Sequence, residues 1–235
     1  MKADQFTQAV RPTVLSQKNF NKIFCVGYNK TGSTTLETVL RLYGFNLPNQ
    51  PEQELRLTKR VFSTDYTELK TFINHYDAFQ DMPFSEGMTY VAADALFPNS
   101  RFILSERDPD DWFDSMNRYF RKKYLSGSDS EKITEQLVSQ KFNYLFPGYN
   151  HLKKEIFLTS FKDDSNVVDW DKLFDRDHYI NLYTQRNNQI KKYFSRSTEK
   201  LLIIDVTKEK NTTSICEFLN LPKEFVIDMP HLNKS

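Results

Sequence analysis

The hydrophobic pattern of the chain contains three short apolar runs, Ile23–Val26, Phe102–Leu104 and Leu201–Val206. Continuous runs of this length are typical of parallel strands that are buried on both faces. A weaker run, Ala78–Asp81, predicts a further strand or strand end. Apolar residues at helical spacing predict helices at about 34–43, 65–76, 89–97, 109–125 and 213–219. This alternation predicts an α/β fold, in which helices flank both faces of a parallel sheet.

The segment from about 126 to 198 breaks this alternation. Its pattern is mostly helical, with interruptions at Pro147-Gly148 and Lys162–Asn166. The segment Gln53–Phe62 fits neither the helix pattern nor the strand pattern clearly. A length of 235 residues suits one domain with a sizeable core. We therefore expect a single α/β domain over residues 1–235, with a helical insertion at about 126–198.

The first apolar run leads into a loop that is suited to binding an anion. Gly27 ends the run, the loop to Gly32 contains Lys30, and a helical pattern begins near Ser33. Backbone N–H groups at a helix start have no partner within the helix, and the helix dipole adds partial positive charge there. The two glycines let the backbone approach a ligand closely. The pattern predicts an anion site, and the alternative is a glycine-containing turn without a ligand.

The loop differs from the Walker A motif G-x-x-x-x-G-K-[ST] in the position of its lysine. Gly27 and Gly32 have the Walker spacing, but Ser33 stands where the lysine belongs and Lys30 lies inside the loop. An ATPase or GTPase needs that lysine at the β- and γ-phosphates and the next hydroxyl on Mg²⁺. Asp205, close to the end of the last apolar run, is the nearest match to a Walker B aspartate.

A second strand-to-helix junction carries a cation and a hydroxyl. Asp108 is suited to cap a helix that starts at Pro109, and the acidic first turn makes this helix start a poor anion site. An anion there must be met by Arg107, just before the cap, and by Ser115, eight residues later. Arginine binds phosphate through two parallel hydrogen bonds, and serine adds a hydroxyl donor. The alternatives are a surface ion pair for Arg107 and an ordinary helix-surface position for Ser115.

Together, the two junctions resemble the donor-binding motifs of sulfotransferases that use 3′-phosphoadenosine 5′-phosphosulfate (PAPS). Lys-Thr-Gly-Ser-Thr-Thr-Leu after a strand that ends in glycine is similar to their 5′-phosphosulfate loop, and the spacing from Arg107 to Ser115 is similar to their 3′-phosphate motif. The resemblance covers residues 22–120, returns at 200–233 in the manner of bacterial-type members, and is loose over 126–198. It implies a P-loop NTPase-like sulfotransferase fold.

The resemblance also implies roles for individual residues. In the family, the loop lysine contacts the phosphosulfate bridge, and the hydroxyl and N–H groups that follow hold the 5′-phosphate. Carried over by position, the donor-binding set is Lys30, Thr31, Gly32, Ser33, Thr34, Thr35, Arg107 and Ser115. PAPS is then the donor and 3′-phosphoadenosine 5′-phosphate (PAP) the product, with Lys30 catalytic and no metal required. The tail departs from the family's Arg-Lys-Gly motif, and His231 and Lys234 are the nearest substitutes.

Transfer to a hydroxyl or an amine also needs a base. Asp81 ends the predicted strand at Ala78–Asp81, and ligands of open α/β sheets bind at the carboxyl ends of strands. His75 lies nearby in sequence, on the predicted helix at 65–76. Many members of the family use histidine or glutamate as the base, so an aspartate is a departure. Both Asp81 and His75 are candidates, and the alternatives are a turn-forming aspartate before proline and a structural histidine.

Composition limits the remaining classes. The net charge of +1, from 32 basic and 31 acidic residues, argues against a general nucleic-acid binder. Cys25 and Cys216 fall in apolar patterns and are expected in the core, and no Cys/His cluster has zinc spacing. No apolar segment suits a secretory signal or a membrane span. We expect a soluble, cytoplasmic protein that acts on a small-molecule or glycan acceptor, and no pattern in the chain fixes its oligomeric state.

Three classes of function remain. The leading interpretation is a PAPS-dependent sulfotransferase that moves a sulfuryl group to a hydroxyl or amine by in-line displacement. The second is a P-loop nucleotide kinase or GTPase, and Ser33 in place of the Walker lysine argues against it. The third is a non-catalytic module that keeps the nucleotide pocket but has lost or changed the chemistry. Lys30, Arg107 and Ser115 argue against loss of the pocket, and this class stays open because the sequence does not fix the base.

Overall fold

The computed structural model describes residues 3–125, 133–141, 145, 147–160 and 167–230. The chain divides into two compact units, one made of Met1–Arg107 with Asn187–Ser235 and the other of Asp108–Arg186. The first unit contains the parallel sheet. The second contains most of the region that was expected to form a helical insertion.

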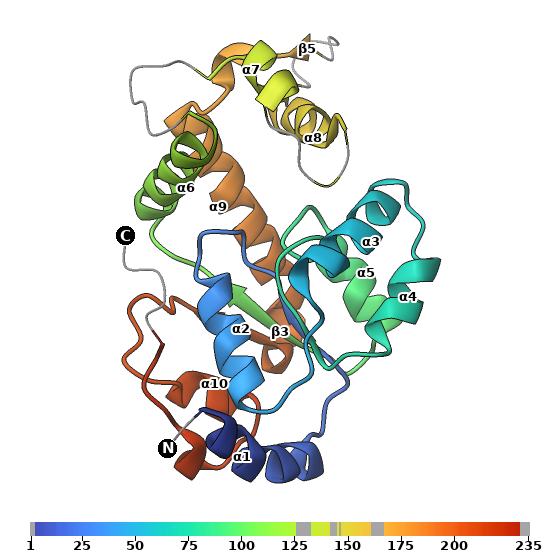
Figure 1. Ribbon diagram of the computed structural model, residues 1–235, viewed down its shortest axis with the longest axis vertical. Helices are drawn as coiled ribbons and strands as arrows, with labels where there is room; N and C mark the ends of the chain where they lie inside the picture. Colours follow the sequence, from blue (N-terminus) through green and yellow to red (C-terminus); the bar gives the residue numbers. More distant parts are fainter. Residues whose placement is uncertain (1–2, 126–132, 142–144, 146, 161–166, 231–235) are drawn as a thin grey trace. The chain divides into compact units, whose positions relative to one another are not determined.

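The first unit is built on a four-stranded parallel sheet in the order β2-β1-β3-β6 (Figure 1). Its strands are β1 (Ile23–Cys25), β2 (Ala78–Phe79), β3 (Arg101–Ser105) and β6 (Leu201–Ile204). In the register, Ile23 pairs with both Ala78 and Arg101, and Phe102 pairs with Leu201. Because all strands run the same way, the loops that follow them gather at one edge of the sheet.

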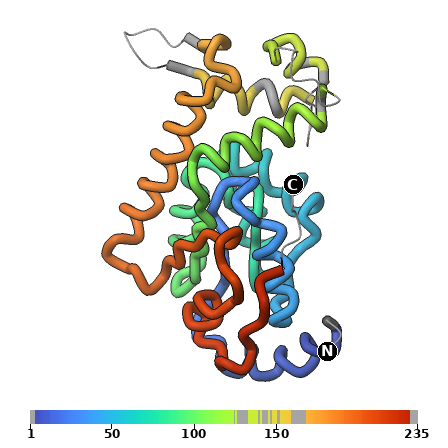
Figure 2. Tube along the Cα trace, turned by 90° about the vertical axis from the view of Figure 1, so that its left-hand side faces the viewer, coloured from blue at the N-terminus to red at the C-terminus, as the bar shows by residue number. Residues whose placement is uncertain are grey.

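Helices cover both faces of this sheet, as the sequence predicts. They are α1 (Ala3–Gln17), α2 (Ser33–Leu42), α3 (Gln50–Phe62), α4 (Thr67–Ile73), α5 (Thr89–Leu96), α10 (Thr213–Phe218) and the end of α9 (Arg176–Tyr193). Residues of α1, α2 and α10 pack with Ile23 and Ile103 on one face. Residues of α3, α4, α5 and α9 pack with Phe24 and Phe102 on the other. Figure 2 shows α1 and α10 at the same end of this unit, where Val10 and Ile215 share one core.

Two helices of this unit have patterns that the sequence analysis did not assign. In α1, Val10 and Val14 lie one turn apart and are both buried, which makes a short apolar stripe inside a polar segment. In α3, which includes most of Gln53–Phe62, the buried face carries Gln53, Glu54 and Thr58 beside Leu57. Polar residues on the buried face hide the amphipathic pattern by which such a helix is normally found.

The second unit contains α6 (Pro109–Tyr124), α7 (Glu135–Lys141), α8 (Tyr149–Leu158) and the first part of α9. It also contains an antiparallel pair, β4 (Thr159–Ser160) and β5 (Val167–Val168), that the expected helical insertion did not include. Asp108 caps α6 as predicted, because its Oδ1 accepts from the backbone N–H groups of Asp110 and Asp111 at 3.0 and 3.2 Å.

Candidate functional site

The loop between β1 and α2 is anchored from within by a buried hydroxyl. Thr31 is fully buried. Its Oγ1 donates to the carbonyl oxygen of Tyr28 at 2.5 Å and lies 2.7 Å from the Oγ of Ser105, at the end of β3. These contacts hold the loop against the neighbouring strand. The Thr31 hydroxyl therefore bonds to other protein atoms and stabilises the conformation of the loop.

Two glycines let the loop lie close to its neighbours. A Cβ atom added at Gly27 would lie 2.4 Å from the carbonyl oxygen of Ser105. Gly32 has a φ of +97°, and a Cβ atom there would lie 2.1 Å from Cγ2 of Val206. Real Cβ atoms do not approach other atoms so closely, and a positive φ disfavours other residues. Packing against β3 and the segment after β6 thus requires both glycines.

The start of α2 leaves its first backbone N–H groups without a side-chain cap. Its N-cap residue is Gly32, no side chain caps the first turn, and that turn carries no acidic residue. The helix therefore has no carboxylate of its own in the first turn to offset the dipole. Thr34 is exposed at this end, while Thr35 Oγ1 donates to the carbonyl oxygen of Pro230 at 3.2 Å. The predicted tail residues that follow Pro230, His231 and Lys234, lie outside the described residues.

Arg107 and Lys30 come together at the carboxyl edge of the sheet. Arg107 follows β3, and β3 pairs directly with β1. Its Nη1 donates to the carbonyl oxygen of Lys30 at 3.5 Å. The cationic residues of two separate sequence motifs therefore occupy adjacent positions beside the start of α2. Ser115, the other residue of the second motif, is half-buried on α6 in the second unit.

The structure brings Asp81 to the same edge. Asp81 follows β2, and its Oδ2 accepts a hydrogen bond of 3.3 Å from Ser33 Oγ, in the first turn of α2. His75 lies before β2, is exposed, and accepts through its backbone carbonyl from Asn46 Nδ2 at 3.1 Å. Because β2 is parallel to β1, its amino end lies at the opposite edge from the loop. The structure therefore does not bring His75 to the loop.

The geometry at this edge agrees with a comparison of the whole chain. The profile of the family described as Sulfotransferase domain matches residues 22–235. The chain belongs to this sulfotransferase family. The match starts one residue before β1 and includes both motifs, so sulfuryl transfer is the general reaction of the matched family. A search of curated proteins found no match.

In this sulfotransferase, Asp205 does not have the surroundings of a Walker B residue. Its Oδ1 accepts from both the backbone N–H and the hydroxyl of Thr207, at 3.0 and 2.6 Å. Its Oδ2 lies 3.5 Å from Lys208 Nζ. The carboxylate thus stabilises the turn after β6. This local use of Asp205 agrees with the sulfotransferase assignment rather than with a kinase or GTPase.

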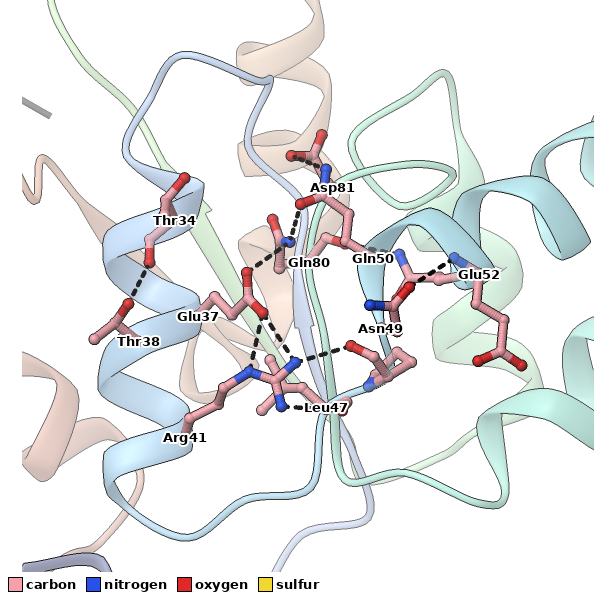
Figure 3. Close-up of polar contacts among 12 residues, drawn as sticks. Thr34, Glu37, Thr38, Arg41, Leu47, Asn49, Gln50, Glu52, Gln80 and Asp81 are labelled. Atoms are coloured by element: carbon pink, nitrogen blue, oxygen red, sulfur yellow. Dashed lines mark hydrogen bonds and ion pairs between the residues drawn. The ribbon is translucent and has the colours of Figure 1, made fainter. Parts of the chain in front are cut away.

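A network of polar side chains next to Asp81 was not found from the sequence. Figure 3 shows Gln80 between Glu37 of α2 and Gln50 of α3. Gln80 Nε2 donates to Glu37 Oε2 at 3.2 Å and to Gln50 Oε1 at 3.1 Å. Gln50 Nε2 donates to Glu54 Oε1 at 3.0 Å and to Asp81 Oδ2 at 3.3 Å. Of this network, only Glu54 lies in the segment Gln53–Phe62, which fitted neither the helix pattern nor the strand pattern.

The carboxylates of this network also affect β1. Burial raises the pKa of the Cys25 thiol to about 12, and the negative charges of Glu37 and Asp81 add to that shift. Cys25 is therefore a neutral core residue, as expected from its pattern, and Cys216 is also buried. Within the described ranges, no group of three or more His, Cys, Asp or Glu side chains could hold a metal ion. Among the helices that the structure describes, none is both long and apolar enough to cross a bilayer.

Proposed function

We propose that this sulfotransferase uses PAPS as its donor and transfers the sulfuryl group to a hydroxyl or amine of a small-molecule or glycan acceptor. The observation that carries the proposal is the adjacency of Lys30 and Arg107, joined by a hydrogen bond of 3.5 Å at the edge where β1 and β3 end. PAPS carries a phosphosulfate on one side of its ribose and a phosphate on the other. Two cationic residues from separate motifs match two anionic groups of one molecule.

The hydrogen-bond donors and positive charges at this edge are suited to bind an anion. They comprise an ammonium, a guanidinium and a helix start without an acidic first turn. The start of α6 differs, since it is capped by Asp108 and has Asp110 and Asp111 in its first turn. We therefore assign the 5′-phosphosulfate to the start of α2 and the 3′-phosphate to the side chain of Arg107. The role of Ser115, which belongs to the second unit, stays a prediction from the sequence.

Most of the contacts to the 5′-phosphate are assigned to backbone N–H groups. The hydroxyl hydrogens of Thr31, Ser33 and Thr35 are each donated to another protein oxygen. Thr34 is exposed at the helix start and is assigned as a hydroxyl donor. The binding set proposed from the sequence is therefore kept, but Thr31, Gly32, Ser33 and Thr35 act through their backbones. This is the arrangement by which helix starts commonly bind phosphate.

Lys30 and Asp81 are assigned separate roles in the reaction. Bound PAPS supplies an activated sulfuryl group on a phosphate leaving group. Lys30 is assigned to stabilise the negative charge that develops on the bridging oxygen. Asp81 is assigned as the base that takes the proton of the attacking hydroxyl or amine. As the acceptor atom forms its bond to sulfur, the bond from sulfur to the bridging oxygen breaks and leaves its electron pair on the phosphate.

Two measurements test this function together. Turnover is followed with ³⁵S-labelled PAPS over a panel of phenols, alcohols, amines and sugars, and binding is followed as the thermal shift with PAP or with ATP and Mg²⁺. A labelled product together with stabilisation by PAP supports the proposal. Stabilisation by ATP and Mg²⁺ alone would indicate a kinase or GTPase. Stabilisation by PAP without transfer to any acceptor would indicate a non-catalytic nucleotide-binding module.

A further inference from the structure

Helix α3 holds the backbone on both sides of Asp81. Gln53 is buried, and its Nε2 donates to the carbonyl oxygen of Gln80 at 2.7 Å and to that of Met82 at 2.6 Å. These are the residues before and after Asp81. One amide group thus fixes the path of the chain where β2 ends. The position of Asp81 relative to α3 is set by this clamp.

Gln50 lies one turn before Gln53 on α3 and contacts the side chain of Asp81. Its Nε2 donates to Asp81 Oδ2 at 3.3 Å and to Glu54 Oε1 at 3.0 Å. The same Asp81 oxygen accepts from Ser33 Oγ at 3.3 Å. The carboxylate is therefore held between α3 and the first turn of α2, the turn assigned to the donor.

The network leaves the Gln50 amide one orientation. Glu37 forms an ion pair of 2.9 Å with Arg41, and an ionised carboxylate only accepts hydrogen bonds. Gln80 must therefore turn its NH₂ group toward Glu37, and its second hydrogen goes to Gln50 Oε1. The NH₂ group of Gln50 then has to face Asp81 and Glu54. The Gln50 amide therefore donates to Asp81 because Glu37 and Gln80 fix which side of that amide faces which partner.

The backbone of Asp81 is also held in an uncommon conformation. Its φ is +63°, in the left-handed region that residues other than glycine rarely adopt. Such conformations persist only where the surroundings fix them, and they cluster at functional sites. The hydrogen bonds from Gln53 to both flanking carbonyl groups and from Gln50 to the side chain supply that constraint.

We propose that Gln50 is a positioning residue for sulfuryl transfer, whose amide holds the Asp81 carboxylate beside the donor loop in the orientation and the ionised state that a base requires. The proposal rests on the function proposed above, in which Asp81 takes the proton of the acceptor. Charged groups on the elements next to Asp81 include Glu37, which pairs with Arg41 on α2, and Glu54 on α3. The loop before α2 carries Lys30, and the Cys25 thiol of β1 is neutral. A hydrogen bond donated to a carboxylate favours its charged form, and Gln50 Nε2 donates one to Asp81 Oδ2.

The test compares Gln50→Leu and Gln50→Glu with a control variant on the same helix. Glu52→Gln is suitable as the control because Glu52 is exposed and contacts Arg56, outside the network. With labelled PAPS and an acceptor that the wild type sulfates, Gln50→Leu is expected to lower kcat at least about tenfold, while the KM for PAPS changes less than about twofold. Gln50→Glu, which adds a negative charge of the same shape, is expected to move the acidic limb of the pH–rate profile to higher pH.

A double-mutant cycle separates positioning from a structural role. In the Asp81→Asn background, Gln50→Leu is expected to lower kcat no further, because its effect passes through Asp81. Lower thermal stability with an unchanged kcat and pH profile would overturn the inference. So would a full additional loss of kcat in the Asp81→Asn background. If Gln50→Leu does not fold, Gln50→Glu carries the test through its pH profile.

The same experiment distinguishes the inference from the function on which it rests. If the wild type transfers the label and both Gln50 variants keep its kcat, Gln50 has no positioning role and the proposed sulfotransferase function still stands. If the wild type neither binds PAP nor transfers label from PAPS, both the proposed function and the proposed role of Gln50 are wrong. Loss of kcat in Gln50→Leu, with PAP still giving the wild-type thermal shift, supports both.

Discussion

Lys30 carries the positive side-chain charge of the loop after β1, which we assign to the donor. The hydroxyl groups of Thr31, Ser33 and Thr35 donate to protein oxygens, so they add little to a bound anion as side chains. The lysine itself has a φ of +68°, which turns the chain within the loop. Its carbonyl oxygen accepts from Arg107, so its backbone is tied to β3 while its side chain carries the charge.

We expect Lys30→Ala to lower the rate of sulfuryl transfer about 10²- to 10³-fold, the usual effect of losing one preorganised donor to developing charge. Single-turnover transfer from labelled PAPS measures the chemical step. Lys70→Ala is a matched control, because Lys70 is exposed on α4. A Lys30→Ala protein with the full rate at saturating PAPS would remove the catalytic role assigned to Lys30.

We expect Gly32→Ala to destabilise the protein by about 2 kcal/mol or more, since the new methyl group meets a positive φ and also collides with Val206. Gly87→Ala is the matched control, because Gly87 has a φ of +47° with no atom near its missing Cβ. The control should cost only about 1 kcal/mol. Urea unfolding of both variants measures the difference. Equal losses of free energy would show that the contact with Val206 does not constrain the loop.

At the scale of elements, local patterns predicted the parts of the site that local interactions form. Strand β1, which lies before Gly27, the start of α2 and the Asp108 cap of α6 each depend on a few neighbouring residues, and each was found in the sequence. Helix α3 was left open because its buried face carries Gln53 and Glu54 in place of apolar residues. The burial of Gln53 depends on the carbonyl groups that the segment after β2 supplies from a distant part of the chain.

The Lys18–Asp77 ion pair joins the segment after α1 to the start of β2, and it gives the fold a defined pH dependence. Partial burial alone would raise the pKa of Asp77, but hydrogen bonds from Lys18 Nζ and the Asn46 N–H outweigh it and hold the pKa below its usual value. A group with a lowered pKa in the folded state stabilises the fold at pH above its unfolded value of about 3.9. That contribution is lost as the pH falls through the folded value.

We therefore expect Asp77→Asn to lower the free energy of unfolding by about 1 kcal/mol at pH 6, and by progressively less below pH 4. Urea unfolding of the wild type and the variant from pH 6 to pH 3 measures this difference. Glu224→Gln, which changes an exposed carboxylate, should leave the difference near zero throughout. A gap between wild type and Asp77→Asn that stays constant with pH would contradict the linkage.

At the scale of the whole molecule, the sequence predicted the class of fold but not the neighbours within it. The strand order β2-β1-β3-β6 places Arg107 beside Lys30 and Asp81 beside Ser33. Pairing between distant segments sets this order, and no local pattern encodes it. The same parallel topology puts His75 at the opposite edge, although it lies only six residues from Asp81 in the sequence.

Because a ligand that binds only the folded state stabilises the whole molecule, the role of Arg107 can be measured through unfolding. At 100 times its Kd, PAP should stabilise the wild type by about 2.7 kcal/mol. At the same concentration, 5′-AMP, which lacks the 3′-phosphate, should stabilise it less. In Arg107→Leu we expect the difference between the Tm shifts of the two nucleotides to become much smaller, because the guanidinium assigned to the 3′-phosphate is gone.

Arg196→Leu, at an exposed position, serves as the matched control and should keep the wild-type preference for PAP. A general loss of positive charge would weaken the binding of both nucleotides in both variants. It cannot reduce the preference for PAP over 5′-AMP in Arg107→Leu alone. If Arg107→Leu still prefers PAP over 5′-AMP by the wild-type margin, Arg107 does not recognise the 3′-phosphate. The adjacency of Lys30 and Arg107 would then support an anion site but not PAPS in particular.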